Sequence, residues 1–502
     1  MKNITIAYGD GIGPEIMESV LQILQACKTK LKFSIIEVGE NIYKKGFNSG
    51  LMPSAWQELE NSKILLKAPI TTPQGGGYKS LNVTLRKKLG LYANIRPVAS
   101  FYPYVSTNFP QMDLVVVREN EEDLYTGIEH RHSLDSYQCL KIATKSSCEK
   151  IVRFAFDYAV KNKRNKVSCF SKDNIMKRTD GIFHEVFNKI AKEYPDIQND
   201  HHIIDIATAR VAAKPQIFDV IVTTNLYGDI ISDVAAEISG SVGLAGSANI
   251  GDNYAMFEAI HGSAPDIANQ DIANPSGLLQ ACIMMLKHIG YNKDAAKIRN
   301  ALYKTIEDGI HTADIYNKNS SVKKVGTKDF TKAIIDNLES SPRSLAIADF
   351  GDDNYIEVAK NNKNDIDSIN IKHQKNTEKS LIGFDLFIDY NENFESLLKI
   401  LQNLESDIFE IKTISCKGLL LWPLIDKHMM PQSTSGLITL RLIAKGVCGK
   451  YSNQIINTKK NILKQDILDM MKYFIENNLD FVKYEGLYHF AGIAGYSASQ
   501  GE

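Results

Sequence analysis

Apolar positions follow two different spacings along the chain up to about residue 340. Short runs rich in β-branched residues, such as Val115–Val117 and Val220–Thr223, alternate with longer segments in which apolar residues recur at helical spacing. The first such pair is a strand at Asn3–Tyr8 and a helix at Pro14–Cys27, and proline suits a first helical turn because its missing N–H needs no partner there. Strands that alternate with helices predict an α/β fold.

A different pattern begins near residue 345. Residues 345–378 are rich in Asn, Asp, Lys and Ser and show little apolar periodicity, which predicts a linker between residues 1–344 and residues 379–502. Beyond the linker, the spacing predicts a strand, helix, strand, strand, helix and strand at 381–390, 394–404, 409–421, 437–445, 466–476 and 481–488. This βαββαβ order predicts an α+β, ferredoxin-like domain at residues 379–502.

The composition excludes several classes of protein. The 502 residues are 44% hydrophobic, which excludes a mostly disordered chain, and a net charge of -1 gives no overall basic field for nucleic acid or a membrane surface. No stretch reaches the length of an apolar membrane span, and the first residues are predicted to form a strand rather than a leader. The seven cysteines form no CxxC pair, as is usual in a reduced compartment. We therefore expect a cytoplasmic protein that binds any anionic ligand at a local site.

The segment Gly9–Glu15 (GDGIGPE) lies between the first predicted strand and helix, where a Rossmann fold binds a dinucleotide. Glu37 ends the next predicted strand, as the ribose-binding acid of that fold does. Pro14, however, occupies the position of the third glycine, and Glu15 would place a carboxylate where a pyrophosphate must lie. We therefore interpret the segment as a tight glycine turn and not as a Rossmann nucleotide site.

A second candidate is the segment SLNVTLR, which begins at Ser80. If Ser80 begins a helix, Asn82 and Arg86 lie near one face, and Arg86 could converge with Arg96 and Arg118 on one cleft. Three guanidinium groups suit a substrate with several carboxylates, because each can bind one carboxylate through two hydrogen bonds. The alternative is three solvated surface arginines, and the spacing alone does not choose between the two interpretations.

Asp229 and Asp233, in the segment NLYGDIISD, are four residues apart and would share one face of a helix. Two like charges at this spacing repel each other unless a cation lies between them. Hard carboxylate oxygens without a set of thiolates favour Mg²⁺ or Mn²⁺ over Zn²⁺. The alternative is a solvated acidic face, but the apolar residues around the pair favour a partly buried metal site.

A fourth candidate is the glycine-rich run Gly240–Gly251 with the segment Glu258–Pro275 that follows it. Small residues around His261 let the backbone approach a ligand closely, and a histidine beside a glycine turn can stack on an adenine or contact a phosphate. Taken alone, this segment is equally compatible with an ordinary loop.

Together, six motifs in this order resemble the isocitrate/isopropylmalate dehydrogenase family: GDGIGPE, SLNVTLR, RENEEDLYTGIE, KDNIMK, NLYGDIISD and HGSAPDIANQDIANP. The resemblance covers about residues 1–340, and the whole chain resembles the long bacterial isocitrate dehydrogenases. It implies an isopropylmalate-dehydrogenase-like doubly wound sheet, which is not of the Rossmann type. It also implies that residues 1–344 form a large and a small subdomain with a cleft between them.

The resemblance implies roles for the substrate and metal residues. Isocitrate enzymes resemble this chain at Ser80 and Asn82, which hold the γ-carboxylate, whereas isopropylmalate enzymes carry apolar residues there. A site built from buried polar groups rejects an apolar analogue, because its own donors would be left unpaired. The resemblance further implies that the substrate carboxylates are bound by Arg86, Arg96 and Arg118, and the metal by Asp205, Asp229 and Asp233. It implies that Lys172 helps to remove the hydroxyl proton and that Tyr125 protonates the enolate. The resemblance places Asp205 and Lys172 in the site of the partner subunit, which implies a homodimer with shared active sites.

The resemblance also implies a nucleotide site, with Thr72 and Glu258 near the nicotinamide. The adenosine would lie among His261, Gly262, Ser263, Ala264, Pro265, Asn274 and Asp314. NADP-using bacterial members carry Lys and Tyr where this chain has Asp266 and Ile267, and Tyr and Arg where it has Ala313 and Asn317. Because Asp266 can accept a hydrogen bond from a ribose 2′-OH and would repel a 2′-phosphate, we expect NAD to be favoured slightly over NADP. Basic residues close in sequence could supply charge from another direction: Lys318, Lys323 and Lys324.

We therefore predict an isocitrate dehydrogenase of the tricarboxylic acid cycle. It would carry out a metal-dependent oxidative decarboxylation of isocitrate to 2-oxoglutarate and CO₂, with hydride transfer to NAD or NADP. The alternatives are an isopropylmalate or tartrate dehydrogenase, which Ser80 and Asn82 disfavour, and a non-catalytic regulatory subunit that binds isocitrate. A regulatory subunit has no need of the metal carboxylates, the lysine and the tyrosine, and this chain carries all of them.

Overall fold

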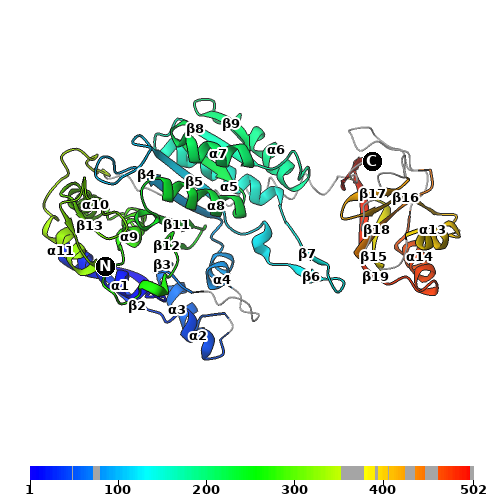
Figure 1. The fold of residues 1–502 in the computed structure, drawn as a ribbon, viewed down its shortest axis with the longest axis horizontal. Helices are drawn as coiled ribbons and strands as arrows, with labels where there is room; N and C mark the ends of the chain where they lie inside the picture. The colour runs from blue at the N-terminus through cyan, green and yellow to red at the C-terminus, as the bar shows by residue number, and fades with distance from the viewer. Residues whose placement is uncertain are drawn as a thin grey trace. The chain divides into compact units, whose positions relative to one another are not determined.

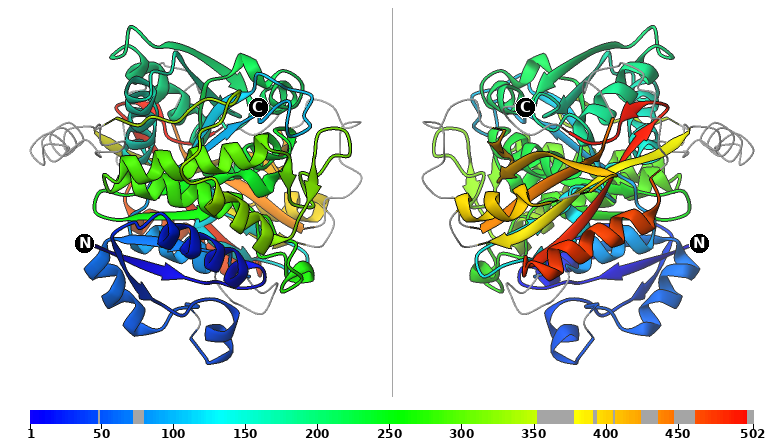
Figure 2. Two further views of the ribbon diagram at one scale, coloured as in Figure 1. Left: turned by 90° about the vertical axis from the view of Figure 1, so that its left-hand side faces the viewer. Right: turned by 90° about the vertical axis from the view of Figure 1, so that its right-hand side faces the viewer.

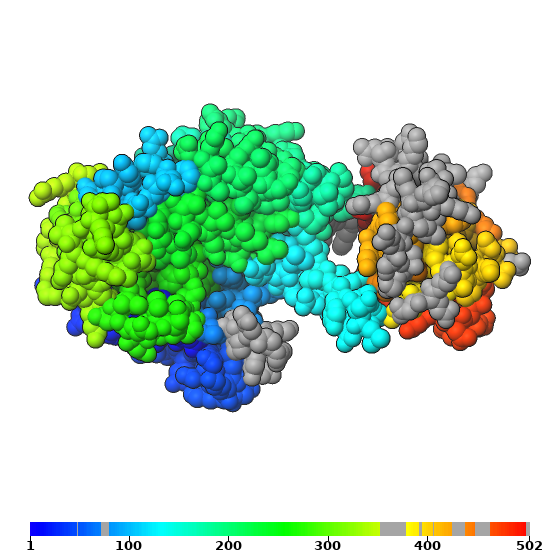
Figure 3. Space-filling view, viewed as in Figure 1, coloured from blue at the N-terminus to red at the C-terminus, as the bar shows by residue number. Residues whose placement is uncertain are grey.

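The computed structural model describes residues 1–47, 49–71, 80–351, 378–390, 394–404, 406–423, 436–446 and 462–497. These residues divide into two compact units (Figure 1; Figure 3). The first unit holds the described residues up to Thr126 and from Lys141 to Gly351. The second holds Gly127–Leu140 and the described residues from Glu378 onwards. Among the described residues, no helix is both long enough and apolar enough to cross a membrane.

The first unit is built on a ten-stranded sheet with the order β2-β1-β3-β12-β11-β4-β5-β10-β8-β9 (Figure 1). Two blocks of parallel strands, β2-β1-β3-β12 and β5-β10-β8-β9, are joined through β11 and β4, which pair antiparallel with their neighbours. In chain order the strands are β1 Lys2–Ala7, β2 Leu31–Ile35, β3 Ile64–Lys67, β4 Ala93–Ala99, β5 Asp113–Glu119, β8 Lys166–Ser171, β9 Gln198–Ile203, β10 Val220–Thr223, β11 Gly246–Ile250 and β12 Ala255–Ala259.

Helices cover both faces of this sheet, so the predicted doubly wound architecture is confirmed. On one side α9 and α10 lie against each other, as do α1 and α11 (Figure 2). The helices of the unit are α1 Gly13–Ala26, α2 Glu40–Lys44, α3 Pro53–Ser62, α4 Leu81–Lys88, α5 Lys145–Lys161, α6 Thr179–Ala191, α7 Ile204–Ala213, α8 Asn225–Ile238, α9 Ser276–His288, α10 Asn292–Glu307 and α11 Thr327–Asp336.

Alternation along β5 explains how the two faces are divided. Val115 and Val117 pack in the cluster that contains the buried residues of α5 and α6, whereas Leu114 and Val116 pack with those of α7 and α8. Because successive side chains of a strand point to opposite faces, Arg118 continues the row of Leu114 and Val116 and faces α8. The period of the strand thus brings this arginine to the helix of the predicted metal ligands.

The segment GDGIGPE forms the predicted tight turn between β1 and α1. Gly9 and Gly11 both have positive φ, and a Cβ on Gly11 would lie 2.0 Å from the carbonyl oxygen of Ser263. The amide of Ile12 donates a hydrogen bond of 2.8 Å to the same oxygen. The turn is therefore packed against protein backbone, which agrees with the fold being of a non-Rossmann type.

The second unit contains a six-stranded sheet in the order β17-β16-β18-β15-β19-β20, with helices α13 and α14. Its central order β16-β18-β15-β19 and its antiparallel pairing are those of a ferredoxin-like fold, as predicted. The predicted single strand at 409–421 is wrong in detail, because Lys417 and Gly418 have positive φ and turn the chain into a hairpin. The elements are β15 Lys379–Tyr390, α13 Phe394–Gln402, β16 Phe409–Cys416, β17 Leu419–Trp422, β18 Gly436–Ala444, α14 Lys464–Glu476, β19 Phe481–Phe490 and β20 Ile493–Ala494.

Most of the predicted linker, residues 352–377, lies outside the described residues. Its first residues pack on the first unit: Leu345 and Phe350 contact the main hydrophobic core. The amide of Leu345 donates to the Glu307 carboxylate at 2.6 Å, and the amide of Ala348 donates to the Asn300 side chain at 2.7 Å.

Candidate active site

Two arginines and two aspartates form a cluster between the sheet and α8. Arg118 lies on β5, and Arg96 lies on the neighbouring strand β4. Nη1 of Arg118 donates to Oδ1 of Asp229, and Nη2 of Arg96 lies 3.1 Å from the same oxygen. Nη1 of Arg96 lies 3.3 Å from Oδ1 of Asp233. The amide oxygen of Asn225 accepts two further bonds from Arg118, at 2.8 and 3.0 Å. The convergence expected for Arg96 and Arg118 is thus present, and both side chains are buried.

Gly228 allows α8 to lie directly on Arg118. A Cβ at position 228 would be 2.5 Å from Cγ of Arg118 and 2.7 Å from its Cβ, which is closer than real atoms approach. The glycine of NLYGDIISD therefore makes room for the arginine, while its helix presents Asp229 and Asp233 beside it.

Arg86, at the end of α4, belongs to a neighbouring group of buried charges. Its Nη2 lies 3.0 Å from Oε1 of Glu258, and Nζ of Lys67 lies 2.7 Å from Oε2 of the same carboxylate. Burial alone would raise the pKa of Glu258, but the charges of Lys67 and Arg86 outweigh it and hold the pKa well below its ordinary value. Nε of Arg86 and Oδ1 of Asn82 are buried without a hydrogen-bond partner among the described residues. Two buried polar atoms with free bonding capacity are what a polar ligand would need here.

The three arginines share one electrostatic environment. The pKa of Arg118 is lowered to about 9 by burial first, and then by the charges of Arg96 and Arg86. It remains protonated at neutral pH, so the site presents three buried guanidinium groups to an anionic ligand.

Tyr125 contacts both an arginine and an aspartate of this cluster. Its hydroxyl donates to Oδ2 of Asp229, and the guanidinium carbon of Arg118 lies 4.9 Å from the centre of its ring. Burial raises the pKa of Tyr125, with the charge of Asp229 adding to the effect. The hydroxyl therefore holds its proton at neutral pH, as a group that supplies a proton must.

Asp229 and Asp233 have the donors that a hard divalent cation requires. Burial raises the pKa of Asp233, and the charge of Asp229 raises it further. For Asp229 the charges of Arg118 and Arg96 outweigh burial, and the pKa lies below its ordinary value. The Asp233 side chain is 60% exposed and the Asp229 side chain 34%, so both can reach a bound ion. The oxygen-only donor set fits Mg²⁺ or Mn²⁺.

Lys172 and Asp205 form a separate pair, with Nζ of Lys172 2.6 Å from Oδ1 of Asp205. The hydrogen bond from Lys172 lowers the pKa of Asp205. Among the described residues, no hydrogen bond or ion pair joins Lys172 or Asp205 to Asp229 or Asp233. One chain therefore carries two groups of the predicted site residues, and among the described residues no direct hydrogen bond or ion pair connects the members of one group to those of the other.

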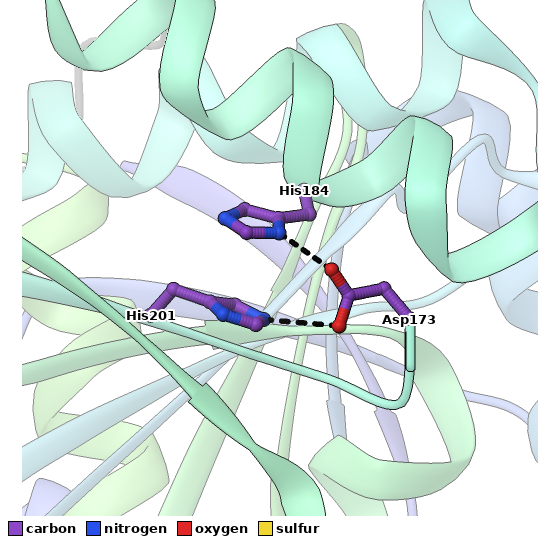
Figure 4. A group of neighbouring side chains, drawn as sticks. All are labelled: Asp173, His184 and His201. Atoms are coloured by element: carbon purple, nitrogen blue, oxygen red, sulfur yellow. Dashed lines mark hydrogen bonds and ion pairs between the residues drawn. The ribbon is translucent and has the colours of Figure 1, made fainter. Parts of the chain in front are cut away.

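Asp173, His184 and His201 form another cluster of metal-ligand types, directly after Lys172 (Figure 4). Oδ2 of Asp173 lies 2.6 Å from Nδ1 of His184, and Oδ1 lies 3.8 Å from Nε2 of His201. The two rings are stacked, with centroids 3.6 Å apart and an interplanar angle of 14°. Imidazole lone pairs lie in the ring plane, so one ion cannot lie in the planes of both rings. The arrangement is that of one carboxylate holding two stacked histidines rather than of a metal centre.

The predicted nucleotide residues gather on two loops of the first unit. Residues 265–267 form a short 3-10 turn that follows Ala264 in a left-handed conformation. Oδ2 of Asp314 accepts hydrogen bonds from Asn274 at 2.9 Å and from the Ser241 hydroxyl at 2.7 Å. Asp266 is exposed. Thr72 lies outside the described residues, and Glu258 is buried beneath Arg86.

Three residues that shape this site were not predicted from the sequence: Lys67, Asn225 and Gly228. Lys67 ends the otherwise apolar strand β3, and a charged residue in such a strand signals a buried partner. Asn225 and Gly228 belong to the NLYGDIISD motif, and their roles depend on the distance to Arg118, which lies far away in the sequence.

Two family models match the chain. One, described as isocitrate/isopropylmalate dehydrogenase, matches residues 3–334, and the other, described as bacterial isocitrate dehydrogenase, C-terminal domain, matches residues 379–502. The predicted resemblance to long bacterial isocitrate dehydrogenases with an extra C-terminal domain is therefore confirmed.

Relatives resemble the chain over nearly its whole length. It is 55% identical over 501 residues to a Rickettsia bellii protein named isocitrate dehydrogenase (NADP), covering 99% of each chain. It is 37% identical over 506 residues to a Thermus thermophilus protein of the same name, covering 100% of this chain and 96% of that one. A crystal structure of a Thermus thermophilus protein matches with a TM-score of 0.88 at 35% identity, covering 100% of this chain and 96% of that one. The chain thus belongs to the isocitrate/isopropylmalate dehydrogenase family.

Proposed function

We propose that the chain is an isocitrate dehydrogenase that converts isocitrate to 2-oxoglutarate and CO₂, with NADP as the hydride acceptor. The observation that carries this proposal is the gathering of three buried guanidinium groups beside Asp229 and Asp233. Isocitrate has three carboxylates, and bidentate arginine pairing is the interaction that recognises a carboxylate most specifically. The two carboxylates that pair with Arg96 and Arg118 are partly exposed, so an anionic substrate can reach these two cations from solvent.

Arg86, Arg96 and Arg118 would bind the substrate carboxylates, and Ser80 and Asn82 would bind the γ-carboxylate. Nε of Arg86 and Oδ1 of Asn82, which have no hydrogen-bond partner among the described residues, support this role. Asn and Gln amides can be turned so that nitrogen takes the place of oxygen, and the Asn82 amide would then donate to the substrate.

Two proton transfers would be carried out by two side chains, one acting as a base and the other as an acid. The partner subunit's Lys172 would take the proton of the substrate hydroxyl while hydride passes to the nucleotide from the carbon that bears this hydroxyl, and Tyr125 would protonate the carbon that loses CO₂. The raised pKa of Tyr125 keeps that proton available. A Mg²⁺ or Mn²⁺ ion held by Asp229, Asp233 and the partner subunit's Asp205 would polarise the substrate carbonyl and stabilise negative charge as CO₂ departs.

We propose a homodimer with shared active sites. The support is the division of the predicted residues of one chain into two groups between which the described part of the chain shows no direct hydrogen bond or ion pair. In the dimer, the pair Lys172 and Asp205 of one subunit would complete the active site formed by Tyr125, Asp229 and Asp233 of the other subunit. Mixing two inactive variants, Tyr125→Phe and Lys172→Met, tests this: subunit exchange should restore one intact site per mixed dimer and therefore measurable activity. Independent sites within each chain would give no recovery.

The nucleotide is proposed to be NADP. The preference for NAD drawn from Asp266 and Ile267 finds no support among the similar proteins reported above, which are named for NADP. Lys323 and Lys324 shortly precede Thr327, whose amide and hydroxyl donate hydrogen bonds to the carbonyl oxygens of Asp271 and Ala273 in the segment of the predicted nucleotide residues. These lysines are exposed and could bind a 2′-phosphate.

Initial rates test the proposal most directly. With isocitrate and Mg²⁺ or Mn²⁺, we expect NADP-dependent formation of equal amounts of 2-oxoglutarate and CO₂, and no turnover of isopropylmalate. A kcat/KM for NADP more than about tenfold above that for NAD corresponds to about 1.4 kcal/mol and would support the NADP assignment. A preference for NAD would instead support Asp266 as a ribose ligand. No turnover of isocitrate with either nucleotide would support the non-catalytic alternative.

The double variant Lys323→Gln/Lys324→Gln distinguishes two hypotheses: that these lysines bind the 2′-phosphate of NADP, and that Asp266 binds the ribose of NAD. If these lysines hold the 2′-phosphate, KM for NADP should rise about tenfold per lost ion pair at low salt, while KM for NAD stays within about twofold. Lys332→Gln, at an exposed position of α11, is the control.

A further inference from the structure

One lysine connects three segments that carry residues of the proposed active site. Nζ of Lys141 lies 2.6 Å from Oδ1 of Asp180 and 3.4 Å from Oδ1 of Asp123. The two carboxylates are buried, and the lysine side chain itself is 12% exposed. Nζ also lies 4.7 Å from the ring centre of Tyr227, in the first turn of α8.

Each carboxylate uses its other oxygen to hold a backbone amide. Oδ2 of Asp180 accepts a hydrogen bond of 2.7 Å from the amide of Lys172. Oδ2 of Asp123 accepts one of 2.9 Å from the amide of Leu226, at the start of the helix that carries the two metal-type aspartates. The carbonyl of Asp123 also accepts a bond from Thr126, which closes the turn that contains Tyr125.

We infer that Lys141 is a positioning residue for the reaction. Its charge holds the Asp123 and Asp180 carboxylates in one geometry, and these carboxylates hold the backbone at Lys172 and the first turn of α8. Without a cation, the two buried carboxylates would repel each other or take up protons, and either change loosens the amides that they bind.

The inference rests on the proposed function, and it adds a link between half-sites. Under that proposal, Lys172 serves the active site of the partner subunit, whereas Tyr125 and α8 serve the site of their own chain. The Lys141 network therefore joins, within one chain, the parts that this chain contributes to two different active sites.

The test replaces Lys141 by Met, which keeps the length of the side chain and removes its charge. We expect kcat with isocitrate to fall about 10- to 100-fold, because small displacements of reacting groups carry losses of this size, while KM for isocitrate changes less than about threefold. The conservative variant Lys141→Arg should recover most of kcat. The matched control is Lys166→Met. Lys166 lies at the start of β8, at the end away from Lys172, and its Nζ is 3.1 Å from Oδ2 of Asp200; its loss should leave kcat unchanged.

A double-mutant cycle separates positioning from general loss of packing. Asp180→Asn keeps an acceptor for the Lys172 amide and removes the charge that Lys141 binds. The effects of Lys141→Met and Asp180→Asn on kcat should therefore be strongly non-additive, whereas those of Lys166→Met and Asp180→Asn should add. If Lys141→Met fails to fold, kcat of Asp180→Asn is compared with kcat of Lys166→Met instead. The inference then predicts a fall in kcat for Asp180→Asn and none for Lys166→Met.

Hydrogen exchange gives a readout that does not depend on activity. Exchange of the Lys172 and Leu226 amides should accelerate in Lys141→Met and not in Lys166→Met. A folded Lys141→Met enzyme with kcat within about twofold of the unmodified chain, or with unchanged exchange at both amides, would overturn the inference. Absence of isocitrate turnover in the unmodified chain would instead overturn the proposed function, and the exchange comparison would still decide the role of Lys141.

Discussion

Both units of the chain pair a buried arginine with a carboxylate against a β-sheet, but the two pairs differ in how accessible the carboxylate is. In the C-terminal unit, Arg441 binds Asp385 through two hydrogen bonds of 2.8 Å, and a third of 2.9 Å goes to the carbonyl of Ser497. Both side chains of this pair are buried, the Asp385 carboxylate being 12% exposed. In the first unit, Arg118 is fully buried, yet its partner Asp229 is 34% exposed.

This difference separates a structural ion pair from a binding site. The Asp385 carboxylate is bound by two nitrogens of the Arg441 guanidinium group and is shielded from solvent. If a ligand displaced one partner of this pair, the other would be left as a buried, unpaired charge. The Asp229 carboxylate lies between guanidinium groups and solvent, and a ligand that arrives from solvent can take its place. Burial of the cation is common to both sites, and accessibility of the anion distinguishes them.

Loss of Arg118 should break the comparison most strongly. We expect Arg118→Met to lower kcat/KM for isocitrate about 1000-fold, or about 4 kcal/mol, because a substrate carboxylate loses its bidentate partner in a desolvated site. Steady-state kinetics measures the effect, and Arg441→Met is the control from the other unit. A similar fall in kcat/KM for both variants would show that the two arginines do not differ in role.

Arg441→Met should act on stability instead. Removing one partner of a buried ion pair leaves Asp385 uncompensated, so the free energy of unfolding should fall by about 4 kcal/mol while kcat of the folded enzyme stays the same. Chemical denaturation followed by far-UV circular dichroism measures it. The double variant Arg441→Met/Asp385→Leu should regain most of the loss, and failure to regain it would argue against the uncompensated charge as the cause.

The pH dependence of stability extends the comparison to a buried carboxyl without an ion-pair partner. Among the described residues, no cation pairs with Glu119. Burial raises its pKa from 4.5 to about 7. Its stabilising contribution is therefore complete below pH 4.5 and is lost as the pH rises through 7, where the native state must ionise a buried group. The free energy of unfolding of Glu119→Gln, relative to the unmodified chain, should rise by about 3 kcal/mol between pH 4.5 and pH 8. Glu410→Gln, at an exposed position, is the control, and a trend of opposite sign in Glu119→Gln would contradict the raised pKa of Glu119.

Gly228→Ala tests the contact between α8 and Arg118. The added methyl group would lie 2.5 Å from Cγ of Arg118, so the side chain or the helix must move. We expect kcat/KM for isocitrate to fall about 30-fold, or about 2 kcal/mol, with little change in thermal midpoint, because alanine also favours the helix. Gly181→Ala, in α6 with open space around its Cβ, is the control. Equal activity of both variants would show that the Arg118 contact is not critical.

Local patterns predicted much of the fold. The strand Val220–Thr223 agrees residue for residue with the structure, and the helices at Pro14–Cys27 and 466–476 agree within two residues at each end. The hairpin at Lys417 and Gly418 was missed, because two strands with a two-residue turn carry one continuous β pattern unless the turn contains a stronger signal than a single glycine. The convergence of Arg96 and Arg118 was proposed from residue type, whereas the partner of each guanidinium was not predictable from spacing.

The sequence by itself determined the order of the elements and the ligand chemistry of Asp229 and Asp233, since period and donor type are local properties. Only the tertiary structure decided which charges meet. Glu258 lies beneath Arg86 and Lys67, Lys141 joins Asp123 to Asp180, and Lys172 pairs with Asp205 apart from the arginine cluster. These contacts join residues that are distant in the chain, and the energy of each depends on burial and distance, which no local pattern contains.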